Sequence, residues 1–188
     1  MKKNFVFAVF LSLFVFAVAA SAQTAPSFTG TWSLDIPKST LDDRAKSNTE
    51  SQTMTVAEKD NTITITTATK RPAPPADAPQ GGRPGGGQGR GGFGGGDGTT
   101  TYTLDGKEVK TETDGPMGKM PTTLKGKLDG GKLHLERSST FSGQMGEVTI
   151  STKDVWELSA DGKALTVSRD SVSPRGSTSS KWVYNKGQ

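Results

Sequence analysis

Short runs of alternating apolar and polar residues, separated by Asp-Gly turns, constrain the fold of this 188-residue chain more than any other feature. Successive side chains of a β-strand point to opposite faces, so a period of two indicates a strand with one buried face. Asp-Gly between two such runs is typical of a tight hairpin, because both turn positions require a positive φ. Such turns occur at Asp105-Gly106, around Asp129-Gly130 and at Asp161-Gly162, and we therefore expect β-hairpins.

The first strand is predicted over residues 28–34, with Phe28, Gly30, Trp32 and Leu34 on one face and the hydroxyl side chains on the other. The predicted hairpins cover 51–66 around Asp60-Asn61, and pair 102–104 with 107–109, 124–128 with 133–135 and 155–158 with 165–167. A last strand is predicted near 179–184. About eight to ten strands with short connections predict an all-β fold, an antiparallel meander closed as a β-barrel.

Two segments depart from the alternation. Residues 40–50 are polar with mixed charge, and we expect either one short helix or a loop there. Between residues 148 and 158, Asp154 falls on the face that Ile150 and Trp156 make apolar. We therefore expect a β-bulge or a strand break near Lys153.

Residues 1–22 have the organisation of a signal peptide. Lys2 and Lys3 precede an apolar run, and Ala20-Ser21-Ala22 provides a small-residue cleavage pattern before Gln23. The run is too short for a good membrane span. We expect export through the Sec pathway to a periplasmic or secreted location, with residues 23–188 forming a single domain. The chain has no cysteine, so no disulfide stabilises it.

Residues 71–98 are rich in proline and glycine, and 12 of the 24 glycines lie between Gly81 and Gly98. Such a segment buries too little apolar area to offset its ordering entropy, so we predict a disordered loop inserted between strands. Arg83, Arg90 and Phe93 give it some likeness to an arginine-glycine RNA-binding tract. The segment has too few arginines to bind the phosphates of a nucleic acid strongly, because affinity grows with the number of phosphate contacts. The net charge of +4 includes Lys2 and Lys3 of the predicted signal peptide. Nucleic acid is therefore not an expected partner.

Several stretches together resemble a set of exported, uncharacterised bacterial lipocalin-like proteins. Their Gly-Thr-Trp-x-Leu start is matched by residues 30–34, and their Pro-x-Lys-Ser continuation is matched in part by 37–39, which lack the spacer residue. Their Tyr-x-Leu-Asp-Gly-Lys-Glu middle is matched by 102–108, and their Trp-x-Leu-Ser-x-Asp-Gly-Lys-x-Leu-Thr-Val stretch by 156–167. Phe28-Thr29-Gly30-Thr31-Trp32 also resembles the opening of lipocalins and of fatty-acid-binding proteins. The resemblance implies a lipocalin-like barrel that holds a small apolar ligand inside.

The residues that we expect to line a ligand site are aromatic: Trp32, Tyr102, Trp156, Trp182 and Tyr184. Each has a simpler interpretation as part of the core. In fatty-acid-binding proteins an arginine and a tyrosine on the last strand hold the ligand carboxylate. Tyr184 matches that tyrosine, but Trp182 stands in the place of the arginine. The lipocalin resemblance further implies a basic residue, Arg169 or Lys181, packed over Trp32 as a cation–π contact.

No catalytic residue, metal ligand or cofactor motif is predicted. His134 is the only histidine and alternates with Glu136 onto the face away from Leu133 and Leu135, which favours a solvated side chain. Asp105, Asp129 and Asp161 have the spacing of turn residues. The larger side chains in the loop-like stretches are candidates either for a barrel mouth or for ordinary loop packing: Met117, Met120, Phe141 and Met145.

These observations favour a non-enzymatic β-barrel protein that binds a small apolar or amphipathic ligand. A barrel filled by its own side chains would contradict this hypothesis. The alternative is a structural or protein-interaction module of the cell envelope, acting through the barrel surface or the loop at 71–98. A barrel-mouth enzyme using Glu136, His134 or Asp154 is a third and weaker hypothesis.

Overall fold

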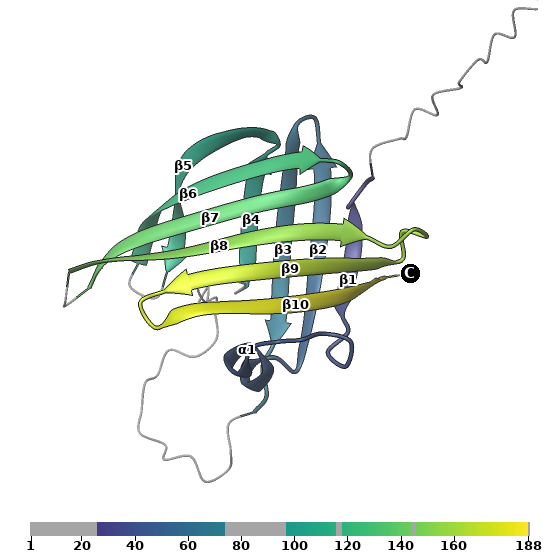
Figure 1. Ribbon diagram of the computed structural model, residues 1–188, viewed down its shortest axis with the longest axis horizontal. Helices are drawn as coiled ribbons and strands as arrows, with labels where there is room; N and C mark the ends of the chain where they lie inside the picture. The colour runs from purple at the N-terminus through teal and green to yellow at the C-terminus, as the bar shows by residue number, and fades with distance from the viewer. Residues whose placement is uncertain (1–25, 74–96, 116–117, 144–145, 188) are drawn as a thin grey trace, which may run out of the picture.

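Ten antiparallel strands form one sheet that curves into a nearly closed barrel (Figure 1). The computed structural model describes residues 26–73, 97–115, 118–143 and 146–187. The elements are β1 (Gly30–Leu34), α1 (Asp43–Asn48), β2 (Ser51–Lys59), β3 (Thr62–Lys70), β4 (Gly98–Thr103), β5 (Asp105–Gly115), β6 (Gly118–Asp129), β7 (Lys132–Gly143), β8 (Gly146–Leu158), β9 (Ala164–Ser173) and β10 (Gly176–Lys186). In the part of the chain so described, no helix is long and apolar enough to span a membrane.

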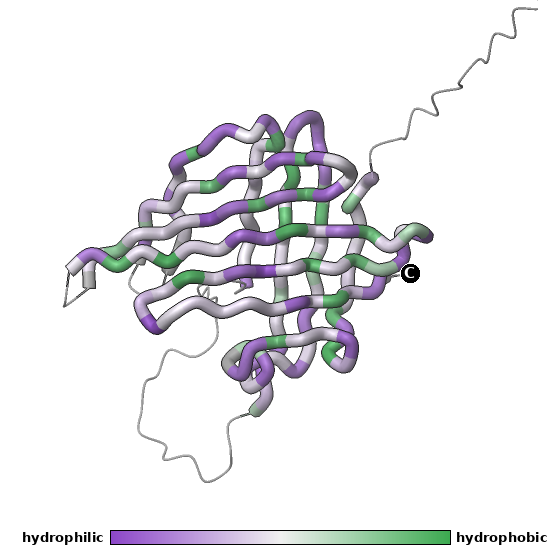
Figure 2. The backbone as a smooth tube through the Cα atoms, viewed as in Figure 1, coloured by the Kyte–Doolittle hydropathy of each residue, from purple (hydrophilic) through white to green (hydrophobic). Residues whose placement is uncertain are grey.

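The order of the strands in the sheet is β4-β3-β2-β1-β10-β9-β8-β7-β6-β5. In Figure 1 the strands β1–β4 run across the direction of β5–β10, so the two halves of the sheet form facing layers around a common interior. The tube in Figure 2 shows hydrophobic and hydrophilic positions alternating along many of the strands. The predicted all-β meander is confirmed, and the period of two is the reason that one face of each strand is buried.

Most of the predicted hairpins are confirmed. β2 pairs with β3 around Asp60, which has a φ of 53°, and β6 pairs with β7 across Gly130 and Gly131. β8 and β9 pair across Gly162. The short helix expected within 40–50 is present as α1, and the Asp42 carboxylate accepts a hydrogen bond of 2.9 Å from the Ala45 amide at its beginning.

The hairpin predicted between residues 102–104 and 107–109 is wrong. β4 pairs with β3, and β5 pairs with β6, so these two strands lie at the opposite edges of the sheet order. The turn itself forms, because the Asp105 carboxylate accepts hydrogen bonds from the Lys107 amide and the Thr103 hydroxyl. Turn chemistry describes how the chain reverses, but it does not decide which neighbour each strand pairs with.

The break expected near Lys153 is also wrong. β8 pairs without a register shift with β7 from Gly146 to Trp156 and with β9 from Ser151 to Leu158. Asp154 stays on the buried face because Arg169, directly opposite on β9, forms an ion pair with it. The irregularity lies instead in β5, between Asp105 and Glu108.

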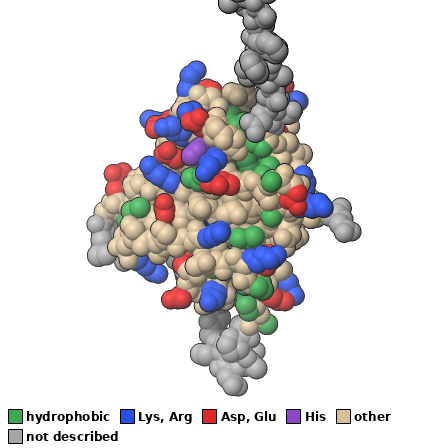
Figure 3. All heavy atoms as spheres, turned by 45° about the vertical axis from the view of Figure 1, so that its right-hand side comes forward, with side chains coloured by type: hydrophobic (Ala, Val, Ile, Leu, Met, Phe, Trp, Pro, Cys, Tyr) green, Lys and Arg blue, Asp and Glu red, His purple; other side chains and the backbone are tan. Residues whose placement is uncertain are grey.

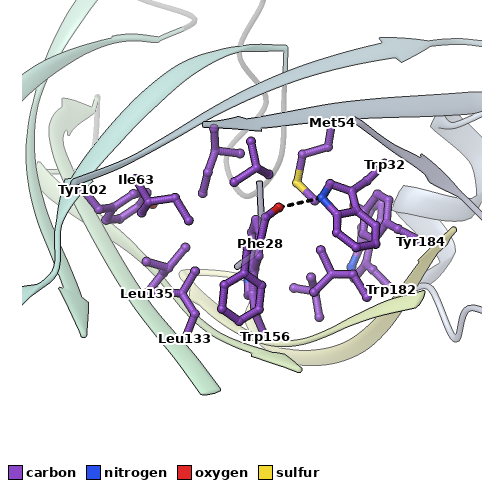
Figure 4. Packing of buried hydrophobic residues seen from close by; sticks show 14 of the residues in the cluster. Phe28, Trp32, Met54, Ile63, Tyr102, Leu133, Leu135, Trp156, Trp182 and Tyr184 are labelled. Carbon is purple, nitrogen blue, oxygen red and sulfur yellow. Dashed lines mark hydrogen bonds between the residues drawn. The ribbon is translucent and has the colours of Figure 1, made fainter. Parts of the chain in front are cut away.

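An aromatic floor closes one end of the barrel. Trp32 is fully buried, and its indole N–H donates a hydrogen bond of 2.9 Å to the Phe28 carbonyl (Figure 4). The Phe28 ring meets Trp156 edge to face, with 6.1 Å between the ring centroids. The basic residue over Trp32 is Lys186, with its Nζ 5.3 Å from the ring centroid. The expectation of Arg169 or Lys181 at this place is therefore wrong, because Arg169 lies over Trp182 instead.

Some predictions fall outside the described residues. The signal peptide at 1–22 does, and so do residues 74–96 of the segment predicted as a disordered loop. Gly98, at the end of that predicted segment, is instead the first residue of β4.

Gly126 allows β4 to pass close to β6 although the two strands are not paired. A Cβ atom on Gly126 would lie 2.6 Å from the Thr103 carbonyl oxygen and 3.1 Å from the Tyr102 Cβ. The first distance is too short for real atoms, and the obstacle is backbone. Glycine at this position therefore permits the barrel to close where β4 and β5 do not pair.

We predict that Gly126→Ala lowers the free energy of unfolding by about 1–3 kcal/mol, because the added methyl group overpacks this contact. Urea unfolding followed by circular dichroism measures the change. Lys125→Ala is the control, since Lys125 faces outward on the same strand and should change stability by less than about 0.5 kcal/mol. Equal stability of Gly126→Ala and wild type would show that β4 and β6 do not approach this closely.

Candidate functional site

A buried ion pair lies in the middle of the barrel. The Arg169 guanidinium donates from Nε to Asp154 Oδ1 at 2.7 Å and from Nη2 to Asp154 Oδ2 at 2.6 Å. Asp154 is 8% exposed. Burial lowers the pKa of Arg169, but the Asp154 carboxylate raises it by more, so the pKa lies above its usual value. Both carboxylate oxygens are therefore occupied by a cation that stays charged.

A second polar contact joins the two layers of the barrel. The Tyr184 hydroxyl on β10 donates a hydrogen bond of 2.7 Å to the Gln52 amide oxygen on β2. The Gln52 amide nitrogen donates to the Thr69 hydroxyl at 2.9 Å. Gln52 is 4% exposed, so its polar side chain is held inside by these partners.

Arg137 on β7 faces the interior, since it shares the alternation of the buried Leu133 and Leu135. Its Nη2 donates to the Thr113 hydroxyl at 3.0 Å. That hydroxyl is 2.8 Å from Thr122, which is 2.8 Å from Ser139, so a row of hydroxyl groups supports the guanidinium. Among the described residues, Arg137 forms no ion pair.

These groups surround a partly open interior cavity of about 80 Å³. Polar side chains line part of its wall and apolar side chains line the rest. The lining residues are Gln52, Met54, Ile65, Thr67, Gly98, Thr100, Tyr102, Leu135, Arg137, Thr152, Asp154, Trp156, Val167, Arg169 and Tyr184. The volume suits a few water molecules or one small polar group, because sites that enclose a whole drug-sized ligand measure about 300–1,000 Å³.

One buried donor in the barrel has no partner. In the described part of the chain, Trp156 Nε1 is the one fully buried side-chain nitrogen or oxygen without a hydrogen bond. Trp156 is 2% exposed and lines the cavity. A buried donor without an acceptor is costly, so each such group needs an explanation.

Beyond the residues that line the cavity, one end of the barrel is less tightly packed. None of residues 146–151 of β8 is buried, nor is any of residues 176–180 of β10. On the inward faces of β7 and β8, Phe141, Val148 and Ile150 are half-buried. This end of the barrel therefore offers an apolar wall that the protein does not cover completely.

The structure brings together three of the five aromatic residues predicted to line a site. Tyr102, Trp156 and Tyr184 line the cavity, whereas Trp32 belongs to the floor and Trp182 lies beneath Arg169. Sequence reasoning missed the site roles of Arg137 and Gln52. The sequence alternation could have identified both residues, because each is a polar residue at an inward-facing position of an alternating strand.

The other predicted candidates lie away from this cavity. His134 faces outward and forms a surface depression with its neighbours on β6 and β7, which are Lys125, Lys127, Asp129 and Glu136. Over the face drawn in Figure 3, basic and acidic side chains are interspersed. No group of three or more metal-ligating side chains that could hold a metal ion occurs in the described residues. Asp105, Asp129 and Asp161 do not line the cavity, and the pKa of each is lowered, chiefly by a hydrogen bond to Lys107, Lys127 and Ser159 respectively.

Of the four side chains proposed for a barrel mouth, Met120 is buried and Phe141 is half-buried. Met117 and Met145 lie outside the described residues, as do Arg83, Arg90 and Phe93.

The fold and the cavity thus define an antiparallel ten-stranded barrel with a small, mixed polar and apolar interior site. No protein-family model matches the chain, and no curated protein matches it. Among solved structures, the chain is similar to zebrafish ileal bile acid-binding protein, crystallised with cholic acid, with 16% sequence identity and a TM-score of 0.46. The match covers 85% of this chain and 98% of that one.

We predict that both tyrosines of the chain stay protonated well above pH 10 while it is folded. Burial raises the pKa of Tyr102 to about 12, with a smaller contribution from Asp154, and burial also raises the pKa of Tyr184. The neutral phenols contribute stability that is present below the unfolded-state pKa of about 10 and is lost as the pH rises towards the folded-state values. Phenolate absorbance at alkaline pH measures this.

The chain in concentrated guanidinium chloride is the control, and its tyrosines should titrate near pH 10. A phenolate that appears near pH 10 with an unchanged native circular dichroism spectrum would show that Tyr102 or Tyr184 is open to solvent.

Proposed function

We propose that the protein is a non-enzymatic binding protein for a small amphipathic ligand, which it holds in the barrel interior. The observation that carries this proposal is the cavity between Arg137 and Trp156, which is bounded by polar and apolar side chains. A cavity of about 80 Å³ receives the polar end of such a ligand. The apolar part then lies along Phe141, Val148 and Ile150, whose half-buried side chains face the same interior.

The protonation states of the site favour binding over catalysis. A general acid or base works best when its pKa is near the working pH. The Asp154 carboxylate is occupied at both oxygens by Arg169, and Tyr102 and Tyr184 have raised pKa values. His134 lies on the outer surface. None of these groups is placed to move a proton within the cavity at neutral pH.

We further propose that the protein acts outside the cytoplasm. Lys2 and Lys3, the apolar run after them and Ala20-Ser21-Ala22 support cleavage before Gln23 and export. The absence of cysteine is compatible with this location, since the fold depends on no disulfide.

A protein-interaction role through the barrel surface is the second candidate. One observation favours it, because β4 and β5 end the sheet order without pairing with each other. Unpaired strand edges present backbone donors and acceptors to which another chain can add.

We expect native mass spectrometry of the protein purified from its own envelope to show a chain beginning at Gln23 with one stoichiometric small molecule. Ile150→Glu should reduce retention of that molecule at least about tenfold, because it places a charge on the apolar wall. Val172→Glu is the matched control, since Val172 is 52% exposed on the outer face of β9.

Denaturing extraction then identifies the class of the retained molecule. A clean apo mass, with no tryptophan fluorescence response to small amphipathic compounds, would contradict the binding function. The search would then move to protein partners of the strand edges.

A further inference from the structure

We propose that two copies of this chain pair through the edge of β5 as antiparallel strands, with Val109 of each copy at the two-fold axis. This surface is distinct from the interior cavity, and the pairing does not depend on a bound ligand. The inference follows from three properties of β5, which are its unpaired backbone edge, an exposed valine on its inward face and a charge pattern that complements its own reversed copy.

The backbone of β5 has a paired neighbour on one side only. Among the described strands β5 pairs with β6 and ends the sheet order, and in Figure 1 it lies at the border of its layer. β4 does not continue the sheet beyond β5, because it approaches the inward face of β6, where a Cβ atom on Gly126 would lie 2.6 Å from the Thr103 carbonyl oxygen. The unpaired backbone donors and acceptors of β5 are therefore available to another strand.

An apolar side chain on the inward face of β5 is left exposed. Val109 lies opposite Leu124 of β6, which is 4% exposed, so both side chains point to the same face. Val109 is nevertheless 39% exposed, and among the described residues Val172 is the other large apolar side chain that is exposed. A strand added beside β5 places a side chain next to Val109 on the side that β6 does not cover.

The outward face of β5 carries opposite charges two residues apart. Glu108 and Lys110 are both exposed, and neither forms an ion pair in the part of the chain that the structure describes. A two-fold axis perpendicular to an antiparallel sheet places one residue opposite its own copy and reverses the order of the residues around it. With Val109 at the axis, Glu108 lies opposite the partner's Lys110, and Lys110 lies opposite the partner's Glu108. Opposite charges directly across two strands stabilise the pairing.

Charge disfavours the other registers of this edge. A charged residue at the axis would face its own copy, which disfavours the registers centred on Glu108, Lys110 and Glu112. With Thr111 or Thr113 at the axis, acidic residues of the two copies would lie opposite each other. In the regular part of β5, from residue 108 to residue 113, Val109 is thus the one centre that gives two pairs of opposite charge and no pair of like charge. Charged edges generally oppose pairing with other strands, and this one accepts its own copy.

The paired segment is short. The irregularity of β5 between Asp105 and Glu108 limits regular pairing to a few residues on either side of Val109. An interface of this size is smaller than those of stable dimers and is typical of transient association. We therefore expect a reversible dimer whose population rises with the concentration of the protein.

Sedimentation velocity of the mature protein, from about 10 μM to about 1 mM, measures the association. Glu108→Lys and Lys110→Glu each place like charges across the axis, and each should weaken the dimer at least about tenfold. An equimolar mixture of these two variants should form a heterodimer, because each chain then supplies charges opposite to those of the other. The double variant Glu108→Lys/Lys110→Glu restores both pairs and should associate as the wild type does.

Glu112→Lys is the matched control for charge. It changes the net charge as Glu108→Lys does, but it lies opposite the partner's Gly106, so the dimer should be unaffected. The chain has no cysteine, so Val109→Cys introduces a single thiol at the axis. Under mild oxidation it should form a disulfide-linked dimer at least about tenfold faster than Val172→Cys, whose thiol lies at a 52% exposed position on β9. Circular dichroism shows whether each variant is folded.

Two results would overturn the inference. The first is a protein that stays monomeric over the whole concentration range. The second is a dimer that tolerates both single charge changes, with Val109→Cys and Val172→Cys linking at equal rates, because the contact would then lie on another face. Neither result bears on the proposed ligand binding, which native mass spectrometry tests separately.

Discussion

The organisation of the barrel interior depends on the ion pair between Asp154 and Arg169. Placing two charges inside a small barrel is unfavourable unless each satisfies the other, and here two short hydrogen bonds do so. Loss of either partner would leave a buried charge, at a cost of about 3–5 kcal/mol. The ion pair therefore adds little net free energy to the stability of the fold. Its consequence is that charged groups remain inside the barrel beside the apolar cluster.

The interior is consequently divided along the strands. At one end Trp32, Phe28 and Trp156 form a closed aromatic floor. At the other end, the inward side chains of β7 and β8 are only half-buried. Between them lies a cavity lined by Arg137, by the Asp154–Arg169 pair and by apolar side chains. This arrangement differs from that of a small barrel filled by its own side chains, and the proposed function places the polar end of a ligand in the cavity.

The features predicted correctly from the sequence are those that local chemistry determines. Alternation identified the buried face of β1, and the turns at Asp60, Gly130 and Gly162 marked true hairpins. The pairing of β4 and β5 was not predictable, because Asp105-Gly106 makes the same turn whether or not the flanking strands pair. The continuous course of β8 was not predicted, because a buried Asp154 is compatible with the strand only when Arg169 lies opposite it. The pairing of these two residues depends on the register between β8 and β9, which the alternation along one strand does not show. Three of the five aromatic candidates line the cavity. Trp32 and Trp182 do not line it, and their rings lie against Lys186 and Arg169 respectively.

A high-resolution crystal structure of the mature protein, purified from its own cells without unfolding, tests the central claim most directly. The claim is that the barrel keeps an unfilled, donor-lined cavity beside the Asp154–Arg169 pair. We predict ordered oxygen atoms, from a ligand or from water, in the cavity and within hydrogen-bond distance of the Arg137 guanidinium. A cavity filled by protein side chains, with Arg137 turned out to solvent, would contradict the account.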